Sequence, residues 1–143
     1  MKSRTFQTQS EDETIALGER LASELPVQAV VLLIGNLGAG KTTIAKGIVK
    51  GLKAADPDQV SSPTFTLVHE YSPAVYHVDL YRLETAAQLA TLGLEEIFDR
   101  LAIVLIEWGE KFPEAMPAER VEIRLRATGE NTREITIDWL RLQ

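Results

Sequence analysis

The sequence has no cysteine, no cluster of lysine or arginine and no long apolar run. The absence of cysteine excludes disulfides, thiolate metal sites and cysteine nucleophiles. The longest apolar runs, at 29–34 and 101–106, are far shorter than the roughly 20 residues of a membrane-spanning helix, so we expect no membrane partner. The first residues have no apolar stretch after their basic side chains, so we also expect no secretory signal.

The charge balance is acidic, with a net charge of −6 and a pI of about 5.0. A protein of this charge is repelled by nucleic acid at long range, so we expect no RNA or DNA binding by the chain alone. The length of 143 residues fits one domain, and a hydrophobic content of 45% is sufficient for a buried core. We therefore expect residues 1–143 to form a single domain.

Local patterns predict a mixture of helices and strands. Ser10 begins a capping-box spacing followed by leucines every four residues, which predicts a helix that ends near Pro26. The runs at 29–34 and 102–106 are continuously apolar, as is typical of strands buried on both faces of a sheet. Helical spacing of apolar residues predicts a further helix over 42–52.

Shorter signals predict two antiparallel hairpins. One joins a strand at 64–71 to a strand at 75–80 through a Ser-Pro turn, and the other joins 121–125 to 135–140 around a Gly-Glu-Asn turn. Arg120, Arg124 and Arg126 alternate with apolar residues and so resemble the solvated face of a strand. Two short helices are expected at 85–91 and 95–100.

The segment GNLGAGKT, residues 35–42, matches G-x-x-x-x-G-K-[ST] in full, between a predicted strand and a predicted helix. Its glycines, Gly35, Gly38 and Gly40, let the backbone N–H groups approach phosphate oxygens closely. Lys41 supplies a cation for the β- and γ-phosphates, and the Thr42 hydroxyl is a ligand for Mg²⁺. The alternative, a chance glycine-rich turn, is disfavoured by the strand before the loop and the helix after it.

These patterns predict an α/β fold of the P-loop NTPase-like kind, a single domain with a mixed sheet, flanking helices and antiparallel hairpin additions. No N/T-K-x-D guanine-reading motif occurs, which favours ATP over GTP.

Two carboxylates follow predicted strands and are candidates for catalysis. Glu107 ends the run at 102–106, and Asp79 ends the apolar part of 75–80. Strand ends deliver such residues to the carboxyl edge of a sheet, beside a phosphate loop. One is expected to help hold Mg²⁺ and the other to orient water, and the sequence leaves their division of labour open.

Other polar residues give weaker signals. Arg82 and Arg133 are candidate cations for the γ-phosphate, although a solvated surface arginine is the favoured interpretation for either one. His69 and His77 lie in predicted hairpin strands without a ligand-spaced partner, and we assign them no chemistry. Segment 64–71 with Asp79 lies where switch segments occur, and the hydroxyls of Ser62 and Thr64 are either part of that site or turn and strand residues without a ligand.

The chain resembles the TsaE (formerly YjeE) ATPases of bacterial tRNA threonylcarbamoyladenosine synthesis. The resemblance runs in order through five segments, SEDETIALGERLA (10–22), GNLGAGKTT (35–43), SPTFTLVHEY (62–71), VYHVDLYRL (75–83) and LIEW (105–108). Beyond Trp108 it thins to a hairpin of suitable length. Asn36 departs from the family, whose members often have Asp there; we expect no loss of activity.

The resemblance implies a cytoplasmic Mg²⁺-dependent ATPase that works with TsaB and TsaD. Those partners transfer a threonylcarbamoyl group to the adenosine beside the anticodon of ANN-decoding tRNAs, so tRNA is reached only through the complex. It also implies Mg²⁺ ligands at Thr42 and Glu107, and a functional acid at Asp79. The implied nucleotide contacts are Gly38, Ala39, Gly40, Lys41, Thr42 and Thr43, with Ser10 near the base and Arg133 as a later contact.

Three hypotheses follow. The leading one is a partner-stimulated ATP hydrolase whose catalytic residues are Asp79, Lys41 and Glu107. The second is a nucleotide-gated binding module that controls assembly of the complex without required hydrolysis. The third is a small phosphotransferase acting on a metabolite, which would need a basic lid that the sequence lacks.

Overall fold

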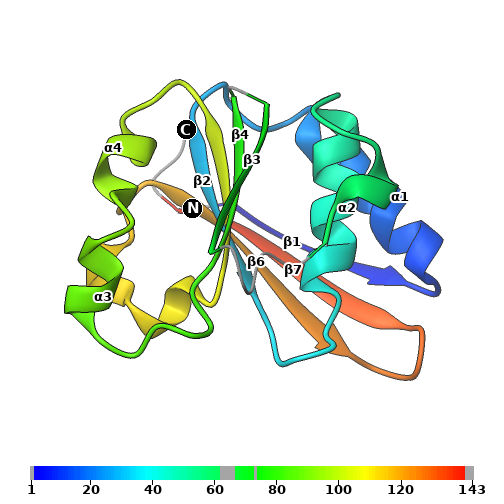
Figure 1. Ribbon diagram of the computed structural model, residues 1–143. Helices are drawn as coiled ribbons and strands as arrows, with labels where there is room; N and C mark the ends of the chain where they lie inside the picture. Colours follow the sequence, from blue (N-terminus) through cyan, green and yellow to red (C-terminus); the bar gives the residue numbers. More distant parts are fainter. Residues whose placement is uncertain (1, 62–66, 73, 141–143) are drawn as a thin grey trace.

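The two continuous apolar runs form neighbouring parallel strands inside a seven-stranded sheet (Figure 1). The computed structural model describes residues 2–61, 67–72 and 74–140. In spatial order the strands are β1 (Lys2–Thr8), β7 (Arg133–Leu140), β6 (Arg120–Ala127), β2 (Ala29–Ile34), β5 (Ile103–Glu107), β4 (Val75–Asp79) and β3 (Val68–Ser72). The four central strands, from β6 to β4, are parallel, and antiparallel strands extend the sheet at both edges.

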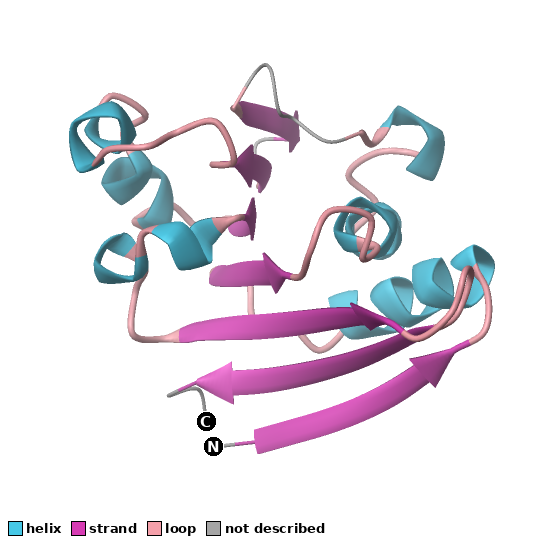
Figure 2. Cartoon of the chain, turned by 90° about the horizontal axis from the view of Figure 1, so that it is seen from below, coloured by secondary structure: helices cyan, strands magenta, loops and turns pink. Residues whose placement is uncertain are grey.

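Helices cover both faces of this sheet, so the molecule has three layers. The α-helices are α1 (Glu11–Ala22), α2 (Lys41–Gly51), α3 (Ala86–Ala90) and α4 (Leu94–Phe98). Three 3-10 turns lie at Pro57–Gln59, Gly109–Lys111 and Pro113–Ala115. In Figures 1 and 2, α1 and α2 lie on one side of the sheet, while α3 and α4 lie on the other.

Each face of the sheet buries its own apolar core, because successive side chains of the central strands point to opposite faces. On β5, Ile103 and Leu105 pack toward α1 and α2, whereas Val104 and Ile106 pack toward α3 and α4. Both cores are therefore built from the same continuously apolar strands, as expected for strands buried on both sides.

Helices α1 and α2 pack at very short range through glycine. An ideal Cβ at Gly47 would lie only 2.0 Å from the carbonyl oxygen of Ile15 in α1, so only a residue without a side chain fits this crossing. The close crossing fixes α2, and with it the loop that precedes α2, against α1.

The predicted elements are confirmed, with shifted ends, where they fall on described residues. The first helix ends at Ala22 rather than near Pro26, and the hairpin strand expected at 64–71 is described as β3 from Val68, after Leu67 with a left-handed φ of 65°. Residues 62–66 of the expected switch, including Ser62 and Thr64, lie outside the described residues. Strand β1 was not predicted from the sequence.

The solvated face expected for Arg120, Arg124 and Arg126 is only partly correct. Arg124 and Arg126 are exposed, but Arg120 is half-buried, and Glu122 on the same face is buried between Arg120 and Arg124. Among the described residues no helix has the length and apolar character to cross a membrane.

Candidate nucleotide-binding site

The loop between β2 and α2 begins the site, because it directs the start of α2 into a cavity. Gly40 is the N-cap of α2 and has a φ of 105°, a conformation that side chains rarely tolerate. Gly40 has no side chain that could cap this helix, so the N-cap residue leaves the N–H groups of the first turn available. A helix start of this kind favours anions, through both its N–H groups and the helix dipole.

A cavity of about 540 Å³ lies over this loop, a volume in the range of small-molecule sites. It brings together eight of the residues predicted for the site: Gly38, Gly40, Lys41, Thr42, Thr43, Asp79, Glu107 and Arg133. Its other lining residues are Glu11, Thr14, Leu37, Tyr81, Trp108 and Asn131. The cavity therefore joins segments from five separate parts of the sequence at one edge of the sheet.

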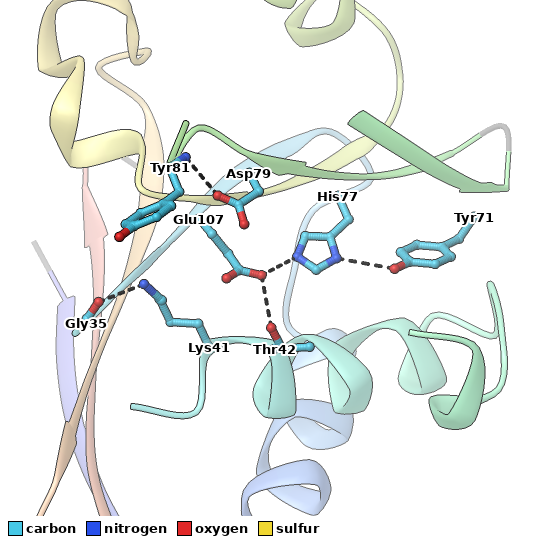
Figure 3. A network of polar contacts seen from close by, with 8 residues as sticks. All are labelled: Gly35, Lys41, Thr42, Tyr71, His77, Asp79, Tyr81 and Glu107. Atoms are coloured by element: carbon cyan, nitrogen blue, oxygen red, sulfur yellow. Dashed lines mark hydrogen bonds and ion pairs between the residues drawn. The ribbon is translucent and has the colours of Figure 1, made fainter. Parts of the chain in front are cut away.

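Lys41 is buried at the base of the cavity. Its Nζ donates a hydrogen bond of 2.7 Å to the Gly35 carbonyl (Figure 3). The same atom lies 3.6 Å from the centroid of the Trp108 ring. Burial lowers the pKa of the Lys41 ammonium below 10.5, while the charges of Glu107, Glu110 and Asp79 oppose that change. The lysine is thus held by a carbonyl and an aromatic face, beside the helix start.

Trp108 reaches Lys41 through a strained backbone. It follows β5 directly and has a φ of 65°, the left-handed region that residues with a Cβ seldom occupy. Its ring also packs against Tyr81, with 5.2 Å between ring centroids. Strain of this kind persists where surrounding contacts impose it, and it is frequent at functional sites.

The two predicted carboxylates are neighbours across β4 and β5. Asp79 is paired in register with Glu107, and both are buried, with exposed fractions of 2% and 3%. Asp79 Oδ1 accepts a hydrogen bond of 2.8 Å from the Tyr81 N–H, whereas Glu107 Oε2 accepts one of 3.3 Å from the Thr42 hydroxyl. Glu107 therefore lies against the start of α2, and Asp79 lies one strand further along the same sheet edge (Figure 3).

His77 is a residue of this network that sequence reasoning missed. Its Nε2 lies 2.7 Å from Glu107 Oε2, and its ring is fully buried. The other ring nitrogen, Nδ1, lies 3.3 Å from the Tyr71 hydroxyl. His69, in contrast, is exposed on β3 and stacks on Tyr71.

Arg133 holds the phosphate loop rather than extending freely into the cavity. Its Nε donates to the carbonyl of Ala39 at 2.9 Å and one terminal nitrogen to that of Gly38 at 3.2 Å, while the other terminal nitrogen contacts three carbonyls of its own hairpin. Arg82 is exposed after β4 and does not line the cavity.

Three of the residues named from the sequence support the cavity without lining it. Gly35 and Ala39 offer the carbonyls that bind Lys41 and Arg133. Ser10 is the N-cap of α1, where its side chain accepts a hydrogen bond of 3.1 Å from the Glu13 N–H. Glu11 and Thr14, from the same helix start, reach the cavity instead.

The oxygen atoms at Thr42 and Glu107 fit a magnesium ion. No group of three or more His, Cys, Asp or Glu side chains suited to a metal occurs within the described part of the chain. Mg²⁺ does not need such a cage, because it binds through one or two protein oxygens and takes its remaining ligands from phosphates and water. A hydroxyl and a carboxylate meeting at a helix start match that requirement.

A strand, a glycine-rich loop and a helix follow one another at the centre of a mixed sheet, and this arrangement defines a P-loop protein of the α/β class. The family model described as "Threonylcarbamoyl adenosine biosynthesis protein TsaE" matches residues 8–135, and the chain belongs to this TsaE family.

Relatives and a solved structure agree with this placement. The Bacillus subtilis (strain 168) tRNA threonylcarbamoyladenosine biosynthesis protein TsaE is 39% identical over 139 residues, covering 95% of this chain and 85% of the relative. The protein of the same name from Nostoc sp. (strain PCC 7120) is 39% identical over 133 residues, covering 88% and 80%. A crystal structure of YdiB from Bacillus subtilis superposes with a TM-score of 0.78 and 32% identity, covering 97% of this chain and 86% of that one.

Proposed function

We propose that the chain binds Mg·ATP in the 540 Å³ cavity and hydrolyses it. The observation that carries the proposal is the convergence, at the start of α2, of a buried lysine, a hydroxyl and two buried carboxylates. A positive helix start with one lysine ammonium beside it suits a triphosphate tail, and the neighbouring carboxylates suit a metal and a reacting water.

Binding is assigned to the loop residues. The N–H groups of Gly38, Ala39 and Gly40 and of the first turn of α2, including Thr43, donate to the β- and γ-phosphate oxygens. Lys41 exchanges its contacts with the Gly35 carbonyl and the Trp108 ring for phosphate oxygens. Bound Mg²⁺ supplies charge neutralisation on the β- and γ-phosphates, and Thr42 and Glu107 are the residues that hold it.

Hydrolysis is assigned to the second carboxylate. Because Glu107 contacts Thr42, Asp79 is left to orient the attacking water and accept its proton. The water oxygen bonds to the γ-phosphorus while the bond from that phosphorus to the bridging oxygen breaks, which yields ADP and inorganic phosphate. Lys41 stabilises the charge that develops on the phosphate oxygens.

Membership of the TsaE family supports a role in tRNA threonylcarbamoyladenosine biosynthesis. In this proposal the chain acts in the cytoplasm and resets a TsaB–TsaD complex by ATP hydrolysis. The net charge of −6 is consistent with tRNA being held by the partners rather than by this chain.

The test measures ATP binding by calorimetry and phosphate release with and without TsaB and TsaD. We expect slow release by the chain alone, faster release with the partners, and loss of nucleotide binding in Lys41→Ala. Unchanged ATP binding and unchanged tRNA modification with Lys41→Ala would contradict the proposal.

One observation favours the alternative of a nucleotide-gated binding module. Among the described residues that line the cavity, the basic ones are Lys41 and Arg133, and the guanidinium of Arg133 is engaged by backbone carbonyls. A second cation for the γ-phosphate is thus not at hand, which predicts slow intrinsic hydrolysis. If Asp79→Ala binds ATP, fails to hydrolyse it and still supports many rounds of tRNA modification, the module is correct.

A further inference from the structure

A chain of hydrogen bonds crosses the sheet from its β3 edge to the phosphate loop. The Tyr71 hydroxyl on β3 contacts His77 on β4, His77 contacts Glu107 at the end of β5, and Glu107 contacts Thr42 at the start of α2 (Figure 3). The shortest link, 2.7 Å, joins His77 Nε2 to Glu107 Oε2. The same carboxylate oxygen therefore meets both the histidine and the threonine hydroxyl.

The burial of His77 is unusual for a structural residue. Its exposed fraction is 0%, and Val75, two residues earlier on the same face of β4, is apolar. A valine or leucine would fill this position without the cost of burying two ring nitrogens. Both nitrogens of His77 have partners, so the side chain is satisfied and its orientation is fixed from two sides.

The donors and acceptors of the chain follow from the groups present. An ionised Glu107 carboxylate accepts only, so His77 Nε2 donates to it. In a neutral imidazole Nδ1 is then the acceptor, and the Tyr71 hydroxyl donates to it. Burial raises the pKa of the Tyr71 hydroxyl. A hydrogen bond with the Ser61 backbone lowers this pKa, and the charge of Glu107 raises it. Tyr71 therefore keeps the proton that it donates.

We propose that His77 is a positioning residue for Glu107, and that Tyr71 in turn positions His77. The pair turns Oε2 of Glu107 toward the Thr42 hydroxyl, which sets the carboxylate where it completes the Mg²⁺ site with nucleotide bound. This inference rests on the proposed function, because it assigns a task to two residues at the proposed Mg²⁺ site. Hydrogen-bond partners of metal-binding carboxylates commonly tune metal affinity in this way.

The experiment separates the two ring nitrogens of His77. In His77→Gln the side-chain amide reaches about as far as Nε2 and keeps a donor for Glu107, whereas in His77→Asn it reaches only about as far as Nδ1. Tyr71→Phe removes the hydroxyl alone from a half-buried side chain. His69→Asn is the matched control, because His69 is the other histidine of the chain and is exposed on the same hairpin.

The readout is the Mg²⁺ coupling, defined as the ratio of the ADP dissociation constants measured by calorimetry without and with Mg²⁺. We expect His77→Asn to lower this ratio about tenfold, Tyr71→Phe about threefold, and His77→Gln and His69→Asn by less than about twofold. ADP affinity without Mg²⁺ should stay unchanged in all four variants. A purely structural defect would weaken ADP binding under both conditions and leave the ratio unchanged.

Two results would overturn the inference. One is a coupling in His77→Asn equal to that of the unsubstituted chain; the other is a loss in His77→Gln as large as in His77→Asn. Should His77→Asn not fold, the other two variants decide the same question. The inference then requires that Tyr71→Phe lowers the Mg²⁺ coupling and that His77→Gln retains it.

Glu107→Gln separates this inference from the proposed function. If Glu107→Gln lowers the coupling and His77→Asn does not, the positioning role fails and the Mg²⁺ site stands. If neither the unsubstituted chain nor any variant binds ADP, the proposed function itself fails.

Discussion

Two glutamates among the described residues are buried, and their surroundings differ. Glu122, on β6, lies between two arginines, with distances of 2.7 Å to Arg120 Nε and 2.6 Å to a terminal nitrogen of Arg124. Glu107, at the end of β5, contacts His77 and the Thr42 hydroxyl and borders the cavity. The first carboxylate is neutralised by permanent cations, while the second is held by groups that orient it.

The comparison teaches that burial alone does not mark a functional carboxylate. A carboxylate clamped by two guanidiniums has its charge compensated within the fold and needs no ligand. A buried carboxylate that faces a hydroxyl at a helix start keeps its charge available to a cation. The partners of each glutamate therefore predict opposite consequences when its charge is removed.

The largest effect is expected from Glu107→Gln, which removes the charge and keeps the shape. We expect ATP turnover in the presence of TsaB and TsaD to fall about 100-fold, because the Mg²⁺ ligand is lost. The melting temperature should stay near that of the unsubstituted chain, because an amide still accepts from Thr42. Normal turnover by this variant, measured as phosphate release, would contradict a functional role for Glu107.

The matched change at the other glutamate, Glu122→Gln, should act on stability instead. Two arginines lose their carboxylate, and we expect the free energy of unfolding in urea to fall by about 1–2 kcal/mol. The full cost of breaking a buried ion pair is not expected, because the side chain of Arg124 is 55% exposed. Nucleotide affinity should be unchanged; a loss of affinity would mean that the two regions are coupled.

A smaller effect is expected from pH, through the buried lysine of the cavity. The pKa of Lys41 is lowered from 10.5 by burial, so its charge is lost at a lower pH than that of an exposed lysine. Nucleotide affinity should therefore fall as pH rises, and the fall should begin below pH 10.5. Above the lowered pKa of Lys41, the affinity should fall by up to about tenfold per pH unit. Lys50→Ala, at an exposed position of the same helix, should give an unchanged pH profile.

The smallest effect is expected from Arg124→Ala, which removes the more exposed of the two cations at Glu122. Arg120 remains beside the carboxylate, with its side chain 26% exposed. We expect a loss of about 0.5 kcal/mol in unfolding free energy, as is usual for an exposed ion pair. A loss as large as that in Glu122→Gln would show that Arg124 carries the neutralisation alone.

Much of the fold was predictable because its central strands have strong local signals. The apolar runs before Gly35 and Glu107 predicted β2 and β5, and the motif between strand and helix predicted the phosphate loop. Strand β1 was missed because KSRTFQT is largely polar. It is an edge strand that pairs with β7, more than a hundred residues away in the chain.

The site was predictable where a residue type has a task within a local motif. Lys41, Thr42 and Glu107 were proposed in this way, and in the structure they line one cavity; their tasks stay predictions. The contact between His77 and Glu107 was not predictable, because the two residues lie thirty positions apart and meet only through the parallel register of β4 and β5. Glu122 was missed for a similar reason, since its arginines were interpreted as a solvated row.

The hydrogen bonds of Arg133 to the phosphate loop have a consequence for the nascent chain. Arg133 belongs to β7, yet its guanidinium binds the carbonyls of Gly38 and Ala39, which are translated about a hundred residues earlier. The same strand also supplies the sheet partner of β1. A nascent chain therefore lacks this brace on its phosphate loop until β7 has been synthesised, so nucleotide capture should follow the synthesis of β7 rather than that of the loop.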